Sequence, residues 1–199
     1  KTGSELAGLM NPILYRADSL EPVARGVFWM SDEPDCPGSK GWGNQYPRTA
    51  LWCRFRRMAD GLEFVALNTH LDNASEESRA RSGPLIARRL PEIAAGGAPV
   101  VVTGDFNCSV GSAAWTALTA PAEQGGAGLA DVLGELFPNA ADLGTYHAYH
   151  GDAGGRRIDF VFASPGLESV AGEVVRYRKD GRYPSDHYPV RAGVRPRAG

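Results

Sequence analysis

Four short polar segments of this sequence carry the residue types that hydrolytic chemistry needs. Each lies beside a run of apolar residues that is typical of a strand, so each is expected at a strand end. The segments are Asn68-Thr69-His70, Asp105-Phe106-Asn107, Arg157-Ile158-Asp159 and Ser185-Asp186-His187. Any one of them alone has a structural explanation, because Asp commonly forms the turn after a strand and a histidine can be satisfied within a core.

Taken together, the four segments predict a shared site. Side chains alternate along a strand, so Asp105 and Asn107 are expected on one side of theirs, and Asn68 and His70 on one side of another. We expect these polar groups to converge at one edge of the sheets. Burying so many of them requires compensating partners, such as hydrogen bonds, a cation or a substrate.

Within that site we expect Asp159 to hydrogen-bond an imidazole nitrogen of His187. The alternative is that Asp159 pairs with Arg157 or caps a turn. A histidine titrates near neutral pH and acts as a base when a carboxylate orients it. The oxygen ligands of Asp and Asn suit Mg²⁺, Mn²⁺ or Ca²⁺ better than Zn²⁺. A cation, a water-activating histidine and further polar donors are what hydrolysis of a phosphate ester requires.

The elements that must position these residues alternate between strand and helix in the middle of the chain, and the end is rich in strands. This order predicts an α/β sandwich with a mixed or mainly antiparallel sheet core and helices outside. Residues 11–30 are expected to form two strands joined by a polar turn. A helix is expected over residues 75–95, capped by Ser75, with a break or kink caused by Pro84 and Pro91.

A Pro- and Gly-rich stretch over residues 31–47 predicts a long ordered loop, and such loops are often functional. The arginines of the predicted helix are interpreted as a solvated face rather than a binding patch. They are Arg79, Arg81, Arg88 and Arg89.

The composition indicates one sizeable soluble domain, which either a cytoplasmic or a secreted protein can have. The chain has 199 residues and a formal net charge of −2. It has no apolar run long enough to span a membrane. The charge argues against a bulk electrostatic grip on nucleic acid, although a local basic groove remains open. The three cysteines form neither a disulfide framework nor a zinc site, and one bridge between Cys36 and Cys53 stays open.

Four motifs in this order, "NTHLD", "TGDFN", "RIDFVF" and "SDHYPV", resemble the endonuclease/exonuclease/phosphatase superfamily. The upstream stretches "NPILYR", "GVFWMSDEP" and "GSKGWGNQYPRTALWCRF" resemble its bacterial metal-dependent hydrolases. The resemblance covers nearly the whole chain. It implies a four-layer α/β sandwich in which two mixed, mainly antiparallel sheets pack together between outer helices.

The resemblance also implies roles for individual residues. His187 would be the catalytic histidine and Asp159 the carboxylate that holds it. Asp105 would orient the attacking water or ligate the metal, Asn107 would contact the scissile phosphate, and His70 would donate to the phosphoryl oxygens. The implied metal ligands are Asp186, Asp105 and Asn107. Further candidates for lining the substrate pocket, with a structural role equally open, are Tyr146, His147, Arg48 and Trp42.

One departure from the superfamily pattern concerns the start of the chain. Relatives begin with a strand carrying an Asn, then a helix, then a strand ending in a metal-binding Glu. No stretch before Asn11 can supply these elements, and Glu5 is interpreted as part of a helix end or loop. We therefore expect residues 1–199 to be one domain that lacks its N-terminal strands. A complementing N-terminal segment is an expected partner.

The resulting functional hypothesis is a metal-dependent phosphoesterase that hydrolyses a phosphate ester by in-line attack of an activated water. Mg²⁺ is the expected ion, with Mn²⁺ or Ca²⁺ as alternatives. A nuclease acting on DNA or RNA is the first alternative function, so nucleic acid stays open as a partner. The second is a non-catalytic binding module on the same fold.

Overall fold

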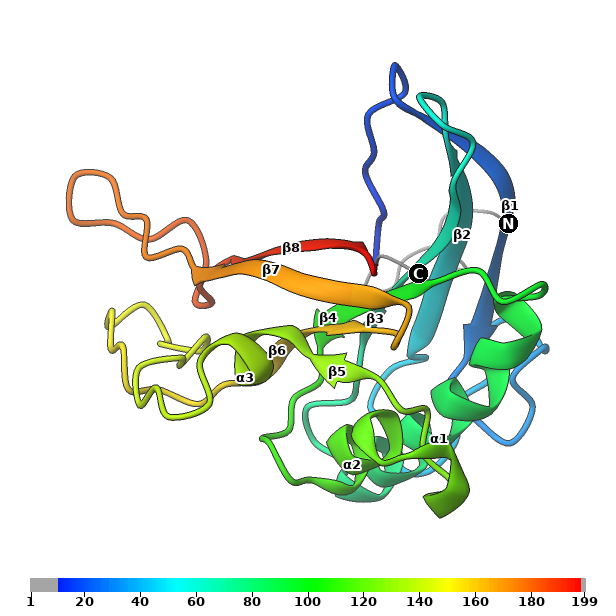
Figure 1. Cartoon of the computed structure of the whole chain (residues 1–199). Helices are drawn as coiled ribbons and strands as arrows, with labels where there is room; N and C mark the ends of the chain where they lie inside the picture. The colour runs from blue at the N-terminus through cyan, green and yellow to red at the C-terminus, as the bar shows by residue number, and fades with distance from the viewer. Residues whose placement is uncertain (1–10, 198–199) are drawn as a thin grey trace.

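Two sheets form the framework of the computed structural model, which describes residues 11–197 (Figure 1). The larger sheet is six-stranded, in the order β1-β2-β3-β4-β6-β5. Strand β3 pairs with β4 in parallel, and the other neighbours in this sheet are antiparallel. Its strands are β1 (Leu20–Trp29), β2 (Thr49–Arg57), β3 (Glu63–His70), β4 (Val100–Asp105), β5 (Ala130–Asp131) and β6 (Asp159–Ala163). The second sheet pairs β7 (Leu167–Val174) antiparallel with β8 (Val190–Pro196).

The helices and the smaller sheet cover opposite faces of the larger sheet. Helices α1 (Glu76–Ile93) and α2 (Ala113–Thr119) pack together on one face, and β7 and β8 lie on the other (Figure 1). A short 3-10 helix, η1 (Ala122–Gln124), follows α2, and α3 (Val132–Leu136) packs against β7 and β6. The expected α/β sandwich, with a mainly antiparallel sheet, a second sheet and outer helices, is confirmed.

Helix α1 begins where the sequence predicts, but it has no break. The Ser75 side chain accepts a hydrogen bond from the Ser78 backbone N–H and caps the first turn. The helix then continues through both Pro84 and Pro91. Each proline removes a backbone hydrogen bond. Burial of the apolar face against the sheet offsets that loss, and this face includes Leu85, Ile86, Leu90 and Ile93.

The start of the described chain contains one strand, not the expected two. Residues 11–16 have no regular secondary structure, and the Leu14 side chain is 93% exposed. Pro12 has no backbone N–H to give to a sheet, so it disfavours a strand here. Side chains attach this segment instead, because the amide groups of Asn11 and Asn68 donate to the Thr49 and Pro12 carbonyls at 2.9 and 3.1 Å.

The main core lies between the large sheet and the helices, and it fixes the strand ends that carry the polar segments. Val65 and Val100 are paired across β3 and β4, as are Leu67 and Val102, and all four are buried. The fully buried Phe106 ring meets Phe160 and Phe162 edge-on, with centroids 5.8 and 5.3 Å apart. Phe106 follows β4 directly, so the residue between Asp105 and Asn107 anchors their turn in the core.

Three further expectations can be compared with the structure. Cys36 is an exposed free thiol and Cys53 is a buried one, so the bridge between them is not formed. Glu5 lies outside the described residues, and the complementing N-terminal segment stays a prediction. Across residues 11–197, every helix is too short or too polar to cross a bilayer.

Candidate active site

The four polar segments meet in one cavity of about 630 Å³. Strand β3 contributes His70, and the end of β4 contributes Asp105 and Asn107. The first residue of β6 and the loop before β8 supply the remaining polar groups, which are Asp159, Asp186 and His187. The expected convergence is therefore found, because β4 lies between β3 and β6 in the sheet and brings their ends together.

The His187 imidazole is held by Asp159, as expected. Nδ1 of His187 lies 2.7 Å from Oδ2 of Asp159. With Nδ1–H donating to that carboxylate, Nε2 is left with a free lone pair. This hydrogen bond is the main cause that raises the pKa of His187 above its usual value, and burial opposes it. The alternative partner for Asp159 is not used, because Arg157 pairs with the buried Asp131.

Asp105 is the carboxylate at the centre of the cavity. Its Oδ2 lies 3.3 Å from Nε2 of His70 and 3.9 Å from Nε2 of His187. Burial, followed by the negative charge of Asp159, raises the pKa of Asp105 to about 6. This carboxyl is therefore held in a place where its negative charge is poorly compensated.

Asn107 reaches the cavity by a turn and not by strand alternation. β4 ends at Asp105, and Asn107 has a φ of 50°, in the left-handed region that Asn adopts more readily than most residues. Its backbone N–H donates to Oδ1 of Asp105 at 2.8 Å, which closes a tight turn. Its side-chain amide donates to the Leu71 carbonyl at 3.0 Å, so its position is fixed from the β3 side as well.

His70 is held as a neutral imidazole. Burial, and then the positive charge of Arg48, lower its pKa to about 4. A neutral His70 has one N–H to donate, and it carries no charge that would repel a bound cation. Asn68, two residues earlier, does not reach the cavity, because its side chain bonds the Pro12 carbonyl and the Thr103 hydroxyl.

The loop that carries Asp186 and His187 is anchored by residues 145–148. The backbone N–H groups of His147 and Ala148 donate to the Asp186 carbonyl at 2.9 and 3.1 Å. The Thr145 hydroxyl accepts from the backbone N–H groups of Ile158 and Asp159 at 3.1 and 3.2 Å. Residues 145–148 thus hold both the loop that carries His187 and the start of the strand that carries Asp159.

The donor set fits a divalent cation. The three expected ligands, Asp105, Asn107 and Asp186, all line the cavity with oxygen-bearing side chains. A second cluster overlaps them: one ligand atom each of Asp105, Asp159 and His187 lies within 4.8 Å of the others. Burial, and then the charge of Asp159, raise the pKa of Asp105, and a cation bound beside it would favour its ionised form.

The four expected substrate-pocket residues divide into two pairs. Arg48 and Tyr146 line the cavity. Trp42 does not, since its indole N–H donates to Asp32 at 2.9 Å and its ring lies beside Arg81. His147 is buried, 4% exposed, with its ring against Tyr188 at 4.0 Å and Tyr183 at 4.6 Å. For these two, the structural role that the sequence left open is the one observed.

Several lining residues were missed by the sequence interpretation. They are Gln45, Tyr46, Asn73, Arg156 and Ile158. Asn73 directly follows the "NTHLD" motif, and Arg156 and Ile158 flank Arg157, so proximity to a motif was an available signal. Gln45 and Tyr46 lie in the Pro- and Gly-rich loop, where only the contacts of the folded chain decide which side chains point inward.

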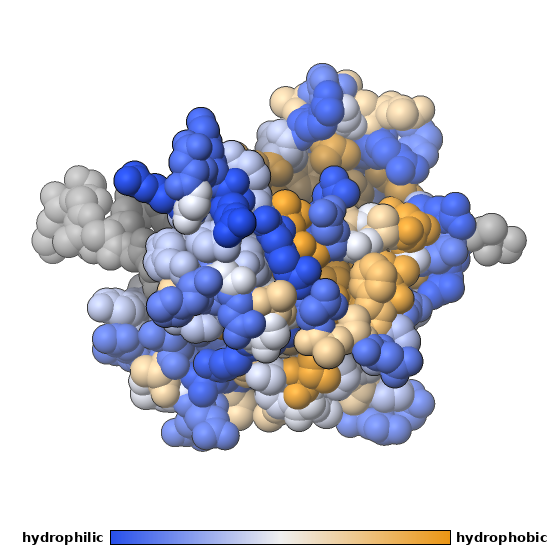
Figure 2. All heavy atoms as spheres, turned by 90° about the vertical axis from the view of Figure 1, so that its left-hand side faces the viewer, coloured by the Kyte–Doolittle hydropathy of each residue, from blue (hydrophilic) through white to orange (hydrophobic). Residues whose placement is uncertain are grey.

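Two of the loops that line the cavity lie at the left of Figure 1, residues 138–157 in yellow and residues 175–189 in orange to red. Figure 2 views the molecule from that side. Hydrophilic residues cover most of one half of this face, and apolar residues gather in the other half. The surface is therefore mixed and is not a continuous apolar docking face.

The fold and the candidate site together describe an α/β sandwich with a histidine–carboxylate pair and a cluster of oxygen-bearing side chains in one cavity. Residues 15–187 match the Endonuclease/Exonuclease/phosphatase family, and the chain belongs to it. No curated protein matched the chain.

Solved structures of similar fold include bacterial and animal proteins. The mannosyl-6-phosphatase Bt3783 of Bacteroides thetaiotaomicron VPI-5482 is 29% identical, with a TM-score of 0.77, over 90% of this chain and 68% of that one. An endonuclease/exonuclease/phosphatase from Bacteroides vulgatus is 32% identical, with a TM-score of 0.79, over 92% and 69%. TDP2 of D. rerio, solved with a single-strand DNA product, is 19% identical with a TM-score of 0.68 over 90% and 70%, and it shares the fold.

Proposed function

We propose that this chain carries the catalytic base of a divalent-metal-dependent phosphoesterase, which hydrolyses its substrate by in-line attack of water on phosphorus. The observation that supports this most directly is the His187–Asp159 pair, 2.7 Å apart, with Nε2 of His187 beside Asp105 in the same cavity. A histidine oriented in this way is suited to accept a proton from water.

In the proposed reaction, Asp105 orients the attacking water and Nε2 of His187 accepts its proton. The water oxygen forms a bond to phosphorus while the bond to the ester oxygen breaks, and the leaving alcohol takes its proton from solvent. Asp159 stabilises the imidazolium that His187 becomes. His70 and Asn107 donate hydrogen bonds to phosphoryl oxygens, where negative charge increases in the transition state.

Asp105, Asn107 and Asp186 would hold the cation, for which we propose Mg²⁺, with Mn²⁺ or Ca²⁺ able to use the same oxygen ligands. When bound, the ion supplies Lewis-acid stabilisation of the phosphoryl oxygens. Arg48 and Tyr146 would contact the substrate from the cavity wall.

For the substrate we propose a small phosphomonoester such as a sugar phosphate. The 29% identity to a mannosyl-6-phosphatase and the net charge of −2 support this choice. The nuclease alternative is supported by the shared fold with the DNA-bound TDP2, and it would require a local basic groove.

The test is an assay of the intact protein with Mg²⁺, Mn²⁺ or Ca²⁺. One arm measures phosphate release from mannose 6-phosphate, and the other measures cleavage of a single-stranded oligodeoxynucleotide. His187→Ala should lower turnover about a hundredfold or more, because removing a general base typically costs about 10²–10⁴ in rate. His150→Ala is the control, since this exposed histidine lies outside the cavity.

The arms separate the three hypotheses. Preferred cleavage of the oligonucleotide would favour the nuclease. Binding of phosphate without turnover in either arm would favour the non-catalytic module. Turnover of His187→Ala within a factor of about two of wild type would show that another group activates the water.

A further inference from the structure

The strongest unexplained feature of the site is the environment of Arg48. This side chain is 3% exposed and pairs with Asp72, which is fully buried, with Nε of Arg48 and Oδ2 of Asp72 3.2 Å apart. Nη2 of Arg48 donates to the Asn73 side chain at 3.0 Å. Nη1 is also buried, but it has no hydrogen-bond partner in residues 11–197. A buried charged donor without a partner is costly, so its retention requires an explanation.

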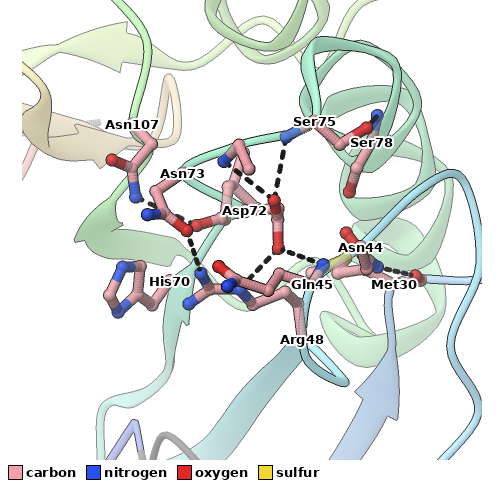
Figure 3. Close-up of polar contacts among 12 residues, drawn as sticks. Met30, Asn44, Gln45, Arg48, His70, Asp72, Asn73, Ser75, Ser78 and Asn107 are labelled. Carbon is pink, nitrogen blue, oxygen red and sulfur yellow. Dashed lines mark hydrogen bonds and ion pairs between the residues drawn. The ribbon is translucent and has the colours of Figure 1, made fainter.

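Nη1, the nitrogen of Arg48 without a hydrogen-bond partner among the described residues, lies on the side of the guanidinium that faces the cavity. Figure 3 shows the group between the Asp72 carboxylate and the His70 ring, with Asn107 nearby. Arg48, His70 and Asn107 line the same cavity, and the positive charge of Arg48 helps to lower the pKa of His70 and partly offsets the rise in the pKa of Asp105. The guanidinium is thus bonded to the protein through Nε and Nη2, and Nη1 remains for a ligand.

The Asp72 carboxylate that pairs with Arg48 is itself fixed by hydrogen bonds to both of its oxygens. Its Oδ1 accepts from the backbone N–H groups of Ala74 and Ser75, both at 2.9 Å, just before α1. Its Oδ2 accepts from Nε of Arg48 and from the backbone N–H of Gln45 at 3.0 Å. Burial raises the pKa of Asp72, but these hydrogen bonds outweigh it, and the net result is a lowered pKa and an ionised carboxylate.

The same carboxylate also fixes the loop at the rim of the cavity. Gln45 lies in the loop before β2, and its neighbour Asn44 is tied to the Met30 carbonyl at 2.8 Å. The Ser75 hydroxyl donates to the Trp42 carbonyl at 2.6 Å. Through these bonds one buried group sets the position of the arginine, the start of α1 and the rim of the cavity (Figure 3).

We propose that Asp72 is a positioning residue that holds Arg48 as a fixed anion-binding arm, with Nη1 reserved for a phosphoryl oxygen of the substrate. This inference rests on the proposed function and extends it, because it assigns the oxyanion contact and the group that orients it. Arg48 is suited to this task because its planar fork can bond the protein on one side and an anion on the other.

The test uses inorganic phosphate as the probe, added to the intact protein in the presence of Mg²⁺. Phosphate affinity is measured by calorimetry, and the Nε–Hε resonance of Arg48 is followed by NMR. In the wild type this resonance should be sharp and should shift as phosphate binds. Asp72→Asn should broaden it and weaken phosphate binding about tenfold, and Arg48→Lys should weaken binding by a similar factor.

Asp131→Asn is the matched control. Asp131 is also buried, also pairs with an arginine, Arg157, and also accepts from a backbone N–H at the start of a helix, but it does not line the active cavity. A purely structural effect would appear equally in both Asp variants. We expect Asp131→Asn to retain wild-type phosphate affinity even where its melting temperature falls.

The outcomes separate this inference from the proposed function. If phosphate binds the wild type without moving the Arg48 resonance, or binds folded Asp72→Asn with wild-type affinity, the inference is wrong and the proposed function stands. If phosphate fails to bind the wild type, the proposed function itself is contradicted. Should Asp72→Asn not fold, the wild-type NMR titration and Arg48→Lys still decide the question.

Discussion

At the scale of single residues, two carboxylates lie beside the His187 imidazole. Asp159 and Asp105 are both close to His187, but they affect it differently. Asp159 bonds Nδ1 directly at 2.7 Å, whereas Asp105 is 3.9 Å from Nε2, a distance that one water molecule hydrogen-bonded to both atoms can bridge. Asp159 therefore orients the His187 imidazole, and Asp105 faces Nε2, the nitrogen that is proposed to accept the proton.

Asp159→Asn should lower turnover and move the pH profile. The hydrogen bond from Asp159 is the largest cause of the raised pKa of His187, so its loss should lower that pKa. The base must be unprotonated to accept a proton, and the acidic limb of kcat/KM should therefore move to lower pH. The plateau should fall about a hundredfold, because the imidazole is no longer oriented. Asp152→Asn, at an exposed aspartate, is the control. An unchanged acidic limb would contradict the assignment.

Asp105→Asn should stabilise the protein at neutral pH when no divalent cation is present. The folded pKa of Asp105, about 6, lies above the unfolded value of about 3.9, so folding favours the protonated carboxyl. Wild-type stability should therefore fall as pH rises from about 4 to about 6, and the amide should avoid this loss.

The measurement is urea denaturation in the presence of a chelator. Asp105→Asn should have a higher free energy of unfolding than the wild type at about pH 7.5, and this difference should disappear at about pH 4. Adding Mg²⁺ at the higher pH should stabilise the wild type more than the variant. Equal stability of the two proteins at both pH values would show that Asp105 is not held in an unfavourable state.

At the scale of elements, the parallel pairing of β3 with β4 determines where His70 and Asp105 meet. These two residues are direct partners in the register of the two strands. The next pair is Thr69 and Gly104, where the backbones approach so closely that a Cβ on Gly104 would lie 2.1 Å from the Thr69 carbonyl oxygen. Gly104 has a φ of 155°.

Gly104→Ala should therefore separate the ends of the two strands. We expect a loss of at least ~2 kcal/mol in the free energy of unfolding, since an added methyl has no space. Any folded fraction should bind Mg²⁺ and phosphate poorly. Gly111→Ala is the matched control, because Gly111 also has a positive φ, of 80°, but open space around its Cβ position. A smaller loss at Gly104 than at Gly111 would contradict this account of the strand contact.

The sequence was sufficient to predict the elements and residues whose signals are local. The strand run that ends at Asp105 and the strand run that follows His187 carry their own information, and so does the Ser75 cap. The continuous α1 could not be foreseen from Pro84 and Pro91, because burial of its apolar face against the sheet is a tertiary effect. The inward-facing Gln45 was missed, and the role of His147 was left open, for the same reason: backbone bonds from distant segments decide their orientation.

At the scale of the whole molecule, the charge balance predicts how substrate binding responds to salt. A net charge of −2 provides little general attraction for a polyanion. We expect KM for a small phosphomonoester to change less than about threefold between about 50 and 200 mM salt, because few counterions are released on binding. A steep rise in KM for an oligonucleotide over the same salt range, with turnover faster than that of the phosphomonoester, would instead support the nuclease.

The strand order has a consequence for how the protein is made. Asp105 leaves the ribosome long before Asp159, and His187 later still, yet the neighbouring strands β4 and β6 and the loop before β8 must bring all three together. Synthesis proceeds from the N-terminus, and contacts between distant segments form slowly. A nascent chain therefore lacks the proposed base until His187 has been translated, so the proposed hydrolysis cannot begin before that point.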